Sequence, residues 1–233
     1  MDKGYIDNDD EKTSNQMSGF NRVKITMLEG AAQAFVFWLG GFETSSTTAT
    51  NCLYELAVHQ DLQGKLVEEI DGVLAKFGSV SYDSINKMPY LYKVISGWYS
   101  PLTTVLHQSA RKKLTVTGTG LRVAKGTAII IPVYGLHSDP DVFPEREKFD
   151  PERFTEENVA SRHRYTYLPF GEGLRNCMGM RFGLVQTKVA IISFLSKYSF
   201  TPGPNLKDPM VMDVGNLMHC PDSNGIVLRI EER

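Results

Sequence analysis

The residues most able to do chemistry lie at positions 169–179, which read PFGEGLRNCMG. This stretch holds three glycines, one arginine and Cys177, one of only three cysteines in the chain. The cysteines are far apart and form no C-x-x-C pair, so neither a zinc site nor a disulfide framework is indicated. A lone thiol framed by glycines indicates instead that a ligand approaches it closely.

The surroundings of Cys177 favour a particular kind of ligand. A helix is expected to start just after Cys177, and the positive end of a helix favours thiolate over thiol. Gly171, Gly173 and Gly179 remove the side chains that would keep a large flat ligand away. Arg175 offers a forked donor for a carboxylate. A planar cofactor with acidic arms and a thiophilic metal fits these features, and haem is such a cofactor.

Two other interpretations of the stretch exist. A nucleotide-binding loop G-x-G-x-x-G starting at Gly171 fails, because it requires glycine at the position of Asn176. A glycine-rich loop around a buried cysteine remains open.

Helices are expected to position this loop. Apolar residues recur every three or four positions from Met178 to Leu195 and from Leu62 to Phe77. The pattern predicts one helix from Met178 and another from about Asp61 to Phe77, which Gly78 ends. Another long helix should begin at Thr26 and Glu29, which have the spacing of a capping box. Its residues 31–42 are apolar on nearly every face, which predicts a central helix buried on all sides.

The rest of the chain predicts little regular structure. Short antiparallel strands are expected at 114–116 and 128–131, and a closing strand at 226–230. Prolines at 132, 140, 144 and 151 should exclude regular elements between them. The fold class expected is mainly α with small antiparallel β-sheets.

Composition excludes several classes of protein. The 233 residues include 25 basic and 27 acidic ones, give a net charge of −2 and are 42% hydrophobic, as in an ordinary folded protein with no nucleic-acid partner. Residues 30–42 are too short a stretch, and too polar around Gln33 and Glu43, to span a bilayer. Residues 1–18 are too polar for a signal peptide. The unpaired cysteines fit a reducing, cytosol-facing setting.

Five residues carry a resemblance to a known family. Phe170, Gly173, Arg175, Cys177 and Gly179 match F-x-x-G-x-R-x-C-x-G, the haem-binding signature of the cytochrome P450 family. The resemblance implies haem b (iron protoporphyrin IX) as cofactor and Cys177 as its axial iron ligand. It also implies that Arg175 pairs with a haem propionate and that the Phe170 ring shields the sulfur.

A second stretch resembles the family segment that lies over the other face of the haem. Residues 40–45, GGFETS, resemble [A/G]-G-x-[D/E]-T-[T/S]. The resemblance implies that Gly40 and Gly41 open a groove for dioxygen, while Glu43 and Thr44 supply a hydroxyl and a proton relay. The alternative is a helix bent by Ser/Thr hydroxyls, with Glu43 emerging into solvent.

The scaffold segments both match and depart from the family. Residues 149–154, FDPERF, and 134–140, YGLHSDP, resemble family segments. In the family the arginine equivalent to Arg153 pairs with an E-x-x-R motif, but here residues 94–101 read VISGWYSP and hold neither residue. Arg153 should therefore lack its partners, at a cost of about 3–5 kcal/mol. Gln108 stands where many members carry an arginine that reaches a propionate.

The resemblance implies a haem-thiolate monooxygenase that inserts one oxygen atom from O2 into an apolar small-molecule substrate. Electrons would come from NADPH through NADPH-cytochrome P450 reductase, at the cytosolic face of the endoplasmic reticulum membrane. Positions 35–47 and 165–183 are similar to insect microsomal members that oxidise foreign compounds. Asn216 and Leu217 fall at the family's last substrate-contacting turn.

The resemblance covers only about the C-terminal half of the family's chain. Residues 1–233 are therefore expected to form a single partial domain, with the N-terminal half and its membrane anchor absent. Two further functions stay open: a non-catalytic remnant that holds haem loosely or not at all, and a helical interaction module.

Overall fold

A computed structural model describes residues 25–102, 106–210 and 225–233, with the side chains at 98–107 left out. The expectations for residues 1–18 and for Asn216 and Leu217 lie outside the described residues. The chain divides into two units, 1–43 and 44–233, which are described separately.

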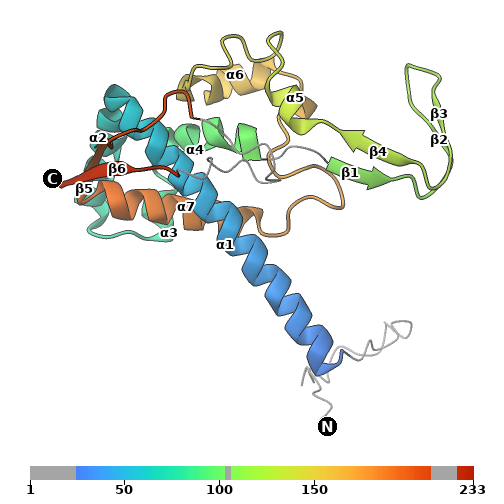
Figure 1. Ribbon diagram of the computed structural model, residues 1–233, viewed down its shortest axis with the longest axis horizontal. Coiled ribbons are helices and arrows are strands. Elements are labelled where there is room, and N and C mark those ends of the chain that lie inside the picture. Colours follow the sequence, from blue (N-terminus) through green and yellow to red (C-terminus); the bar gives the residue numbers. More distant parts are fainter. Residues whose placement is uncertain (1–24, 103–105, 211–224) are drawn as a thin grey trace. The chain divides into compact units, whose positions relative to one another are not determined.

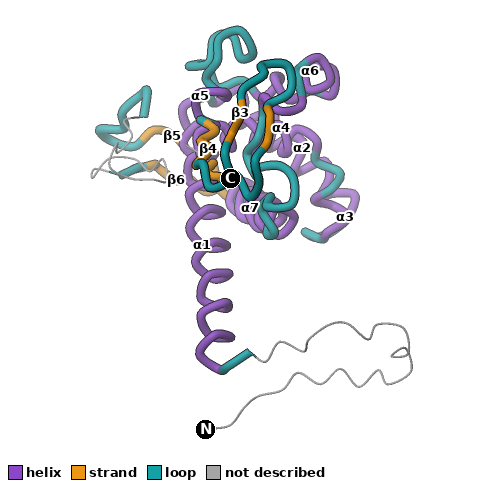
Figure 2. Tube along the Cα trace, turned by 90° about the vertical axis from the view of Figure 1, so that its right-hand side faces the viewer, coloured by secondary structure: helices purple, strands orange, loops and turns teal. Residues whose placement is uncertain are grey.

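Helices dominate the described residues, and the strands are short (Figure 1; Figure 2). The α-helices are α1 (Met27–Val58), α2 (Gln60–Phe77), α3 (Tyr82–Ile85), α4 (Pro89–Leu102), α5 (Val133–His137), α6 (Glu156–Ser161) and α7 (Met180–Leu195). Two 3-10 helices are η1 (Pro151–Phe154) and η2 (Arg164–Thr166). The strands are β1 (Leu106–Ser109), β2 (Leu114–Thr115), β3 (Arg122–Val123), β4 (Ala128–Ile131), β5 (Tyr198–Pro202) and β6 (Leu228–Glu232).

The strands of the described residues pair as three antiparallel sheets of two strands each, β1–β4, β2–β3 and β5–β6. The predicted fold class, mainly α with small antiparallel sheets, is therefore confirmed. The two strands predicted near positions 115 and 130 exist, but they do not pair with each other. Each instead pairs with a strand that lacks a clear apolar pattern, Leu114 with Val123 and Gln108 with Ile129.

The start of α1 has the predicted capping box. The Glu29 carboxylate accepts from the Thr26 N–H and hydroxyl, both at 2.8 Å, and the Thr26 hydroxyl accepts from the Glu29 N–H at 3.2 Å. These bonds satisfy donors that the first helical turn would otherwise leave unpaired.

The prediction that residues 31–42 are buried on all sides is wrong for the described chain. Phe35 is 59% exposed and Trp38 is 62% exposed, and Trp38 stacks on Phe42 with ring centroids 5.8 Å apart. These aromatic rings therefore find contacts mainly within their own helix. In the described part of the chain no helix is both long enough and apolar enough to cross a membrane.

The core lies in the second unit, where α2, α4, α7 and the later turns of α1 pack together (Figure 1). Its fully buried side chains include Leu56, Leu66, Leu91, Ile95, Ile191, Ile192 and Leu195. The predicted helices at 61–77 and after 178 are confirmed, and Gly78 ends α2 with φ 74°, a left-handed conformation that favours glycine.

A buried amide ties three elements of this core together. The Gln63 side chain donates to the carbonyls of Leu56 and Phe200, both at 2.8 Å, and accepts from the Phe200 N–H at 2.9 Å. Gln63 is 4% exposed, so water does not reach these bonds. The amide therefore satisfies the Leu56 carbonyl of α1 and the backbone polar groups of Phe200 in β5 in place of water.

The proline-rich region contains short helices, contrary to the prediction that it would be irregular. Pro132 directly precedes α5 and Pro151 is the first residue of η1. Proline is tolerated in the first helical turn because the missing N–H would have no partner there. The spacing of prolines therefore limited helix length rather than preventing helices.

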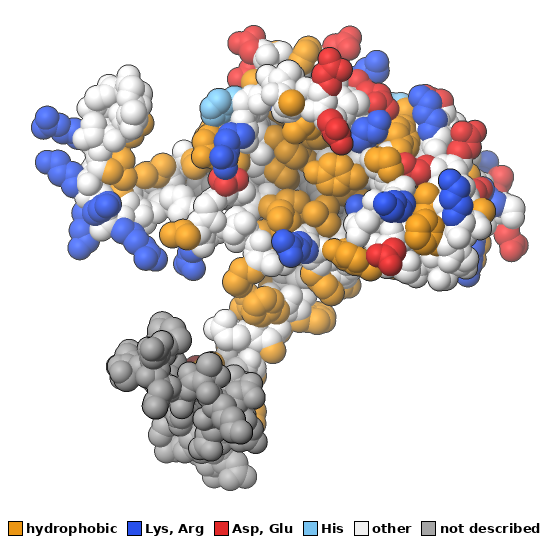
Figure 3. Space-filling view, turned by 180° about the vertical axis from the view of Figure 1, so that it is seen from behind, with side chains coloured by type: hydrophobic (Ala, Val, Ile, Leu, Met, Phe, Trp, Pro, Cys, Tyr) orange, Lys and Arg blue, Asp and Glu red, His pale blue; other side chains and the backbone are white. Residues whose placement is uncertain are grey.

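Positive charge gathers on the hairpin formed by β2 and β3. Lys and Arg side chains crowd the edge of the molecule that this hairpin forms (Figure 3). The exposed cations are Arg111, Lys112, Lys113, Arg122 and Lys125.

Candidate functional site

The cysteine stretch forms a loop between η2 and α7 that closes on itself. The Cys177 N–H donates to the Phe170 carbonyl at 2.8 Å, and the Gly171 N–H donates to the Leu168 carbonyl at 3.2 Å. Gly171 and Gly173 have φ angles of 71° and 84°, a region that other residues enter only with strain. The glycine spacing therefore allows the tight turn that brings Cys177 back beside Phe170.

Cys177 is exposed, whereas Cys52 is completely buried in α1. Burial raises the pKa of the Cys52 thiol strongly, with a smaller contribution from the Glu55 carboxylate. The interpretation of residues 169–179 as a loop around a buried cysteine is therefore wrong. The sulfur of Cys177 remains accessible to a ligand.

Large apolar side chains close to Cys177 in the chain are exposed as well. Leu174, Met178 and Phe182 are 104%, 84% and 68% exposed, which is unusual for large apolar residues so close together. A Cβ built on Gly173 would meet no atom within 4 Å. The loop therefore offers an open apolar surface next to a thiol.

A cation completes this surface. Arg175 is exposed and makes no hydrogen bond or ion pair with any described residue. A thiol, an apolar surface without obstructing side chains and an available guanidinium fit a haem, which has an iron, an apolar ring and carboxylate arms. Gly179 directly precedes α7, and its Cβ position lies 4.0 Å from the Cys177 sulfur.

At the start of the loop, Phe170 packs against the core. Phe170 is half-buried against the core and borders an open hollow of about 220 Å³. The hollow is lined by Tyr92, Ser96, Tyr167, Pro169, Phe170, Gly171, Met180 and Leu184. The Phe170 ring thus lies on the protein side of the cysteine loop.

The residues predicted to face the haem from the other side all lie in α1. Gly40, Gly41 and Glu43 belong to the unit 1–43, and Thr44 begins the unit 44–233. A Cβ built on either glycine would meet no atom within 4 Å beyond the helix itself. The Thr44 carbonyl accepts from the Thr48 hydroxyl at 2.8 Å.

Within the second unit, α1 passes close to α7 directly after Thr44. The Ser45 hydroxyl oxygen lies 3.6 Å from the position of a Cβ built on Gly183 of α7. The structure thus brings together the loop residues 170–179 and places Thr44 next to a contact with the helix that follows them. The roles of Gly40, Gly41 and Glu43 remain predictions.

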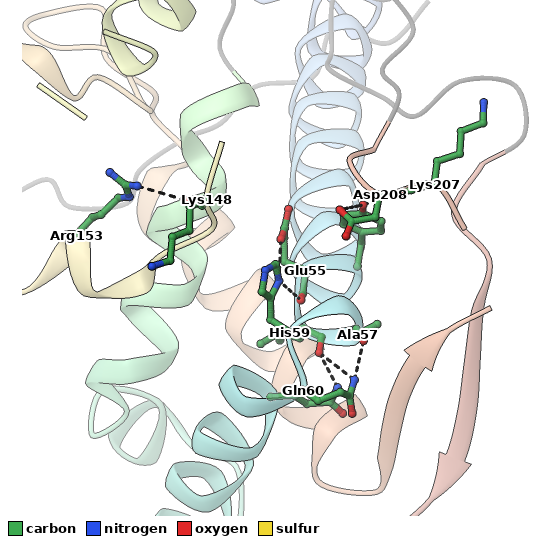
Figure 4. A network of polar contacts seen from close by, with 11 residues as sticks. Glu55, Ala57, His59, Gln60, Lys148, Arg153, Lys207 and Asp208 are labelled. Carbon is green, nitrogen blue, oxygen red and sulfur yellow. Dashed lines mark hydrogen bonds and ion pairs between the residues drawn. The ribbon is translucent and has the colours of Figure 1, made fainter. Parts of the chain in front are cut away.

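Arg153 lacks the glutamate and arginine of the E-x-x-R motif, as expected, but backbone carbonyls take their place. Its guanidinium donates to the carbonyls of Pro144, Glu145 at 2.7 Å and Lys148 at 3.5 Å, the last of which is drawn in Figure 4. Backbone carbonyls replace the missing carboxylate, so no unpaired buried charge results. The predicted loss of 3–5 kcal/mol therefore does not apply.

An ion pair joins η1 to α4. Lys93 of α4 pairs with Glu152 of η1 at 2.7 Å. Gln108, the other departure from the family pattern, is exposed on β1 opposite Ile129.

Two residues that hold the loop were missed by the sequence reasoning. His137 is 3% exposed and its Nε2 accepts from the Leu168 N–H at 2.8 Å. The Tyr167 hydroxyl donates to the Ser96 carbonyl of α4 at 2.7 Å. A histidine and a tyrosine in polar segments give no periodic signal, and the bonds join positions that are far apart in sequence.

An acidic cluster lies at the end of α1 (Figure 4). Burial, with the nearby Asp208 carboxylate as a second cause, raises the pKa of Glu55 to about 7. Glu55 Oε2 lies 3.3 Å from His59 Nδ1, and the Tyr54 hydroxyl donates to the Lys207 carbonyl at 2.8 Å. This cluster holds the segment around Asp208 against α1.

Comparison with known proteins agrees with the geometry of the loop. The sequence profile of the family described as Cytochrome P450 matches residues 7–227. The chain is 41% identical over 211 residues to a protein named probable cytochrome P450 6a14 of Drosophila melanogaster, covering 89% of this chain and 41% of that protein. It is 40% identical over 206 residues to cytochrome P450 6B1 of Papilio polyxenes, covering 87% and 41%.

A third relative, cytochrome P450 6a2 of Drosophila melanogaster, is 43% identical over 212 residues, covering 87% of this chain and 41% of that protein. The chain thus spans about two fifths of the length of these relatives. The predicted similarity to insect members is confirmed. The chain belongs to the cytochrome P450 family.

Proposed function

We propose that the chain is the haem-binding portion of a haem-thiolate monooxygenase, which inserts one oxygen atom of O2 into an apolar small molecule while the other leaves as water. The observation that carries the proposal is the exposed Cys177 sulfur on a glycine-rich loop beside exposed apolar side chains. Few ligands other than haem need a thiolate, a flat apolar surface and a cation together.

Each residue of the loop has a defined task in this proposal. Cys177 would supply a thiolate to the haem iron, and Arg175 would donate to a propionate. Phe170 covers the protein side of the sulfur and keeps water from it. Gly171 and Gly173 keep side chains away from the surface that the haem would cover. Gly179 lets α7 begin without a side chain against the haem. When bound, haem would supply the redox chemistry that activates dioxygen.

The residues of α1 would handle protons. Gly40 and Gly41 leave backbone surface open for a small molecule. Glu43 and Thr44 would deliver protons to the oxygen that leaves as water, a general acid role. Both side chains are exposed in the described structure. The exposure of Glu43 and the bond from the Thr48 hydroxyl to the Thr44 carbonyl also fit the alternative of a helix with back-bonding hydroxyls, so the proton role rests on the resemblance.

Electrons would come from NADPH through NADPH-cytochrome P450 reductase, at the cytosolic face of the endoplasmic reticulum membrane. Foreign apolar compounds would be the substrate class. These assignments rest on family membership.

Isotopically heavy dioxygen tests the reaction. The full chain is reconstituted with haem, NADPH and the reductase and given a monoterpene hydrocarbon. Heavy oxygen in an alcohol product supports the proposal, and product that acquires its oxygen from water contradicts it. Thr44→Ala should raise the peroxide released per NADPH consumed, while Thr50→Ala, an exposed threonine later in α1, serves as control.

A second candidate function is haem binding without turnover. Residues 94–101, which hold neither the glutamate nor the arginine of the family's E-x-x-R motif, motivate it. A chain that takes up haem through Cys177 but consumes no NADPH with the reductase would support this candidate.

A further inference from the structure

His137 lies at the end of α5 and is almost completely buried, at 3% exposed. Its Nε2 accepts a hydrogen bond of 2.8 Å from the N–H of Leu168, which is buried too. An imidazole nitrogen accepts only when it carries no proton, so Nε2 must be the unprotonated nitrogen here. A buried N–H that lost this acceptor would have no water to replace it.

Leu168 also begins a series of backbone hydrogen bonds that reaches Cys177, through its carbonyl, which lies in the peptide group after the one bonded to His137. The Leu168 carbonyl accepts from the Gly171 N–H at 3.2 Å, and the Phe170 carbonyl accepts from the Cys177 N–H at 2.8 Å. The position of the His137 ring therefore fixes one end of the turn that sets where the Cys177 sulfur lies.

The imidazole ring is itself held from two sides. Its centroid lies 5.0 Å from the Tyr167 ring and 6.3 Å from the Phe143 ring, the latter edge-on. The Tyr167 hydroxyl is bonded to the Ser96 carbonyl of α4. The acceptor atom is thus oriented by packing before any ligand arrives, as a positioning residue requires.

We propose that His137 is a positioning residue for Cys177: its Nε2 anchors the root of the cysteine loop so that the sulfur is presented toward the haem iron. The part of this proposal that concerns the haem iron rests on the proposed haem-thiolate function. The anchoring itself is a property of the chain without haem.

The competing explanation is that His137 only fills space in an aromatic cluster. Two substitutions distinguish the role of the Nε2 acceptor from the role of the imidazole ring. His137→Phe keeps the ring and removes the acceptor, whereas His137→Gln loses the ring and can place an amide oxygen near the position of Nε2. His137→Asn has the same amide but is one methylene shorter and cannot reach Leu168. His163→Phe is the matched control, because His163 is exposed and accepts from the Tyr165 N–H instead.

The first measurement needs no haem. Amide hydrogen exchange of residues 168–177 is followed by mass spectrometry in the full apo chain. His137→Phe and His137→Asn should exchange about tenfold faster in this segment, the equivalent of one lost hydrogen bond. His137→Gln and His163→Phe should stay near the parent rate. Equal exchange in the Gln and Asn variants would overturn the proposal, even if the Phe variant does not fold.

The second measurement reads the sulfur. After reconstitution with haem, the carbon monoxide complex shows one Soret band with thiolate ligation and another without it. The Phe and Asn variants should lose most of the thiolate band while the Gln variant keeps it. Thiolate bands at the parent level in all three variants would overturn the positioning role. If the parent chain takes up no haem, the proposed function fails, and the exchange result still decides whether His137 anchors the loop.

Discussion

The ring of Phe149 occupies the space into which a side chain at Gly97 would point. A Cβ built on Gly97 would lie 2.9 Å from Phe149 Cε2 and within 3.6 Å of two further ring carbons. Residue 97 lies within α4, in the stretch 94–101 that holds neither residue of the family's E-x-x-R motif. The ring therefore packs directly against the backbone of α4.

This contact predicts that Gly97→Ala destabilises the chain. Alanine gains about 1 kcal/mol over glycine in a helix, but forcing a methyl group against a packed ring costs about 1–3 kcal/mol. We expect a net loss of about 1 kcal/mol in the free energy of unfolding, measured with urea. Gly72→Ala, where nothing lies within 4 Å, should be stabilising by about 0.5–1 kcal/mol.

A double-mutant cycle provides the check on this cause. Phe149→Leu should be less harmful in the Gly97→Ala background than in the parent, because the smaller side chain makes room for the methyl group. Purely additive effects would show that the ring is not what penalises the alanine.

Gln63→Leu should destabilise the chain by about 1–3 kcal/mol, because it leaves the buried Phe200 N–H without an acceptor. Urea unfolding of this variant is compared with that of Lys65→Ala, an exposed change in the same helix that should have an effect within about 0.5 kcal/mol. A Gln63→Leu variant as stable as the parent would show that the amide network contributes little.

Glu55 makes stability depend on pH. Its pKa in the folded chain is about 7, above the ordinary value of 4.5, so the folded state holds the proton more tightly than the unfolded state does. The stability that this proton contributes is fully present below pH 4.5 and is lost as pH rises through 7. Glu55→Gln should therefore gain on the order of 2 kcal/mol relative to the parent at pH 8 and little at pH 4.5. An equal difference at both pH values would contradict this origin.

The two described cysteines should differ in reactivity. Cys177 is exposed and Cys52 is fully buried with a raised pKa, so iodoacetamide should modify Cys177 in the native chain and leave Cys52 unmodified. Peptide mass mapping gives the extent of modification at each site, and unfolding in urea should abolish the difference. Native modification of Cys52 at the rate of Cys177 would mean that the packing around α1 opens readily.

Short-range patterns predicted much of this chain. The Thr26 and Glu29 capping box, the end of α2 at Gly78 and the exposed Cys177 follow from local rules of hydrogen bonding and glycine conformation. The contacts that position the loop do not, because His137 and Leu168 are distant in sequence and only the fold brings them together.

Other features depend on partners that local patterns could not specify. Arg153 was expected to leave a costly gap without its E-x-x-R partners, but it bonds to backbone carbonyls, which any sequence provides. The strand at 114–115 pairs with residues 122–123, which have no strong strand pattern of their own. Residues 31–42 were expected to be buried from their apolar composition, but composition does not say which segment covers a helix.

The most direct test of the account is a carbon monoxide difference spectrum of the reduced full chain after reconstitution with haem. The parent and Cys52→Ala should show a thiolate-type Soret band, and Cys177→Ala should show none, because Cys177 is the exposed one of the two cysteines that the structure describes. A thiolate band that persists in Cys177→Ala would contradict the assignment of the iron ligand, and the absence of haem uptake by the parent chain would contradict the site itself.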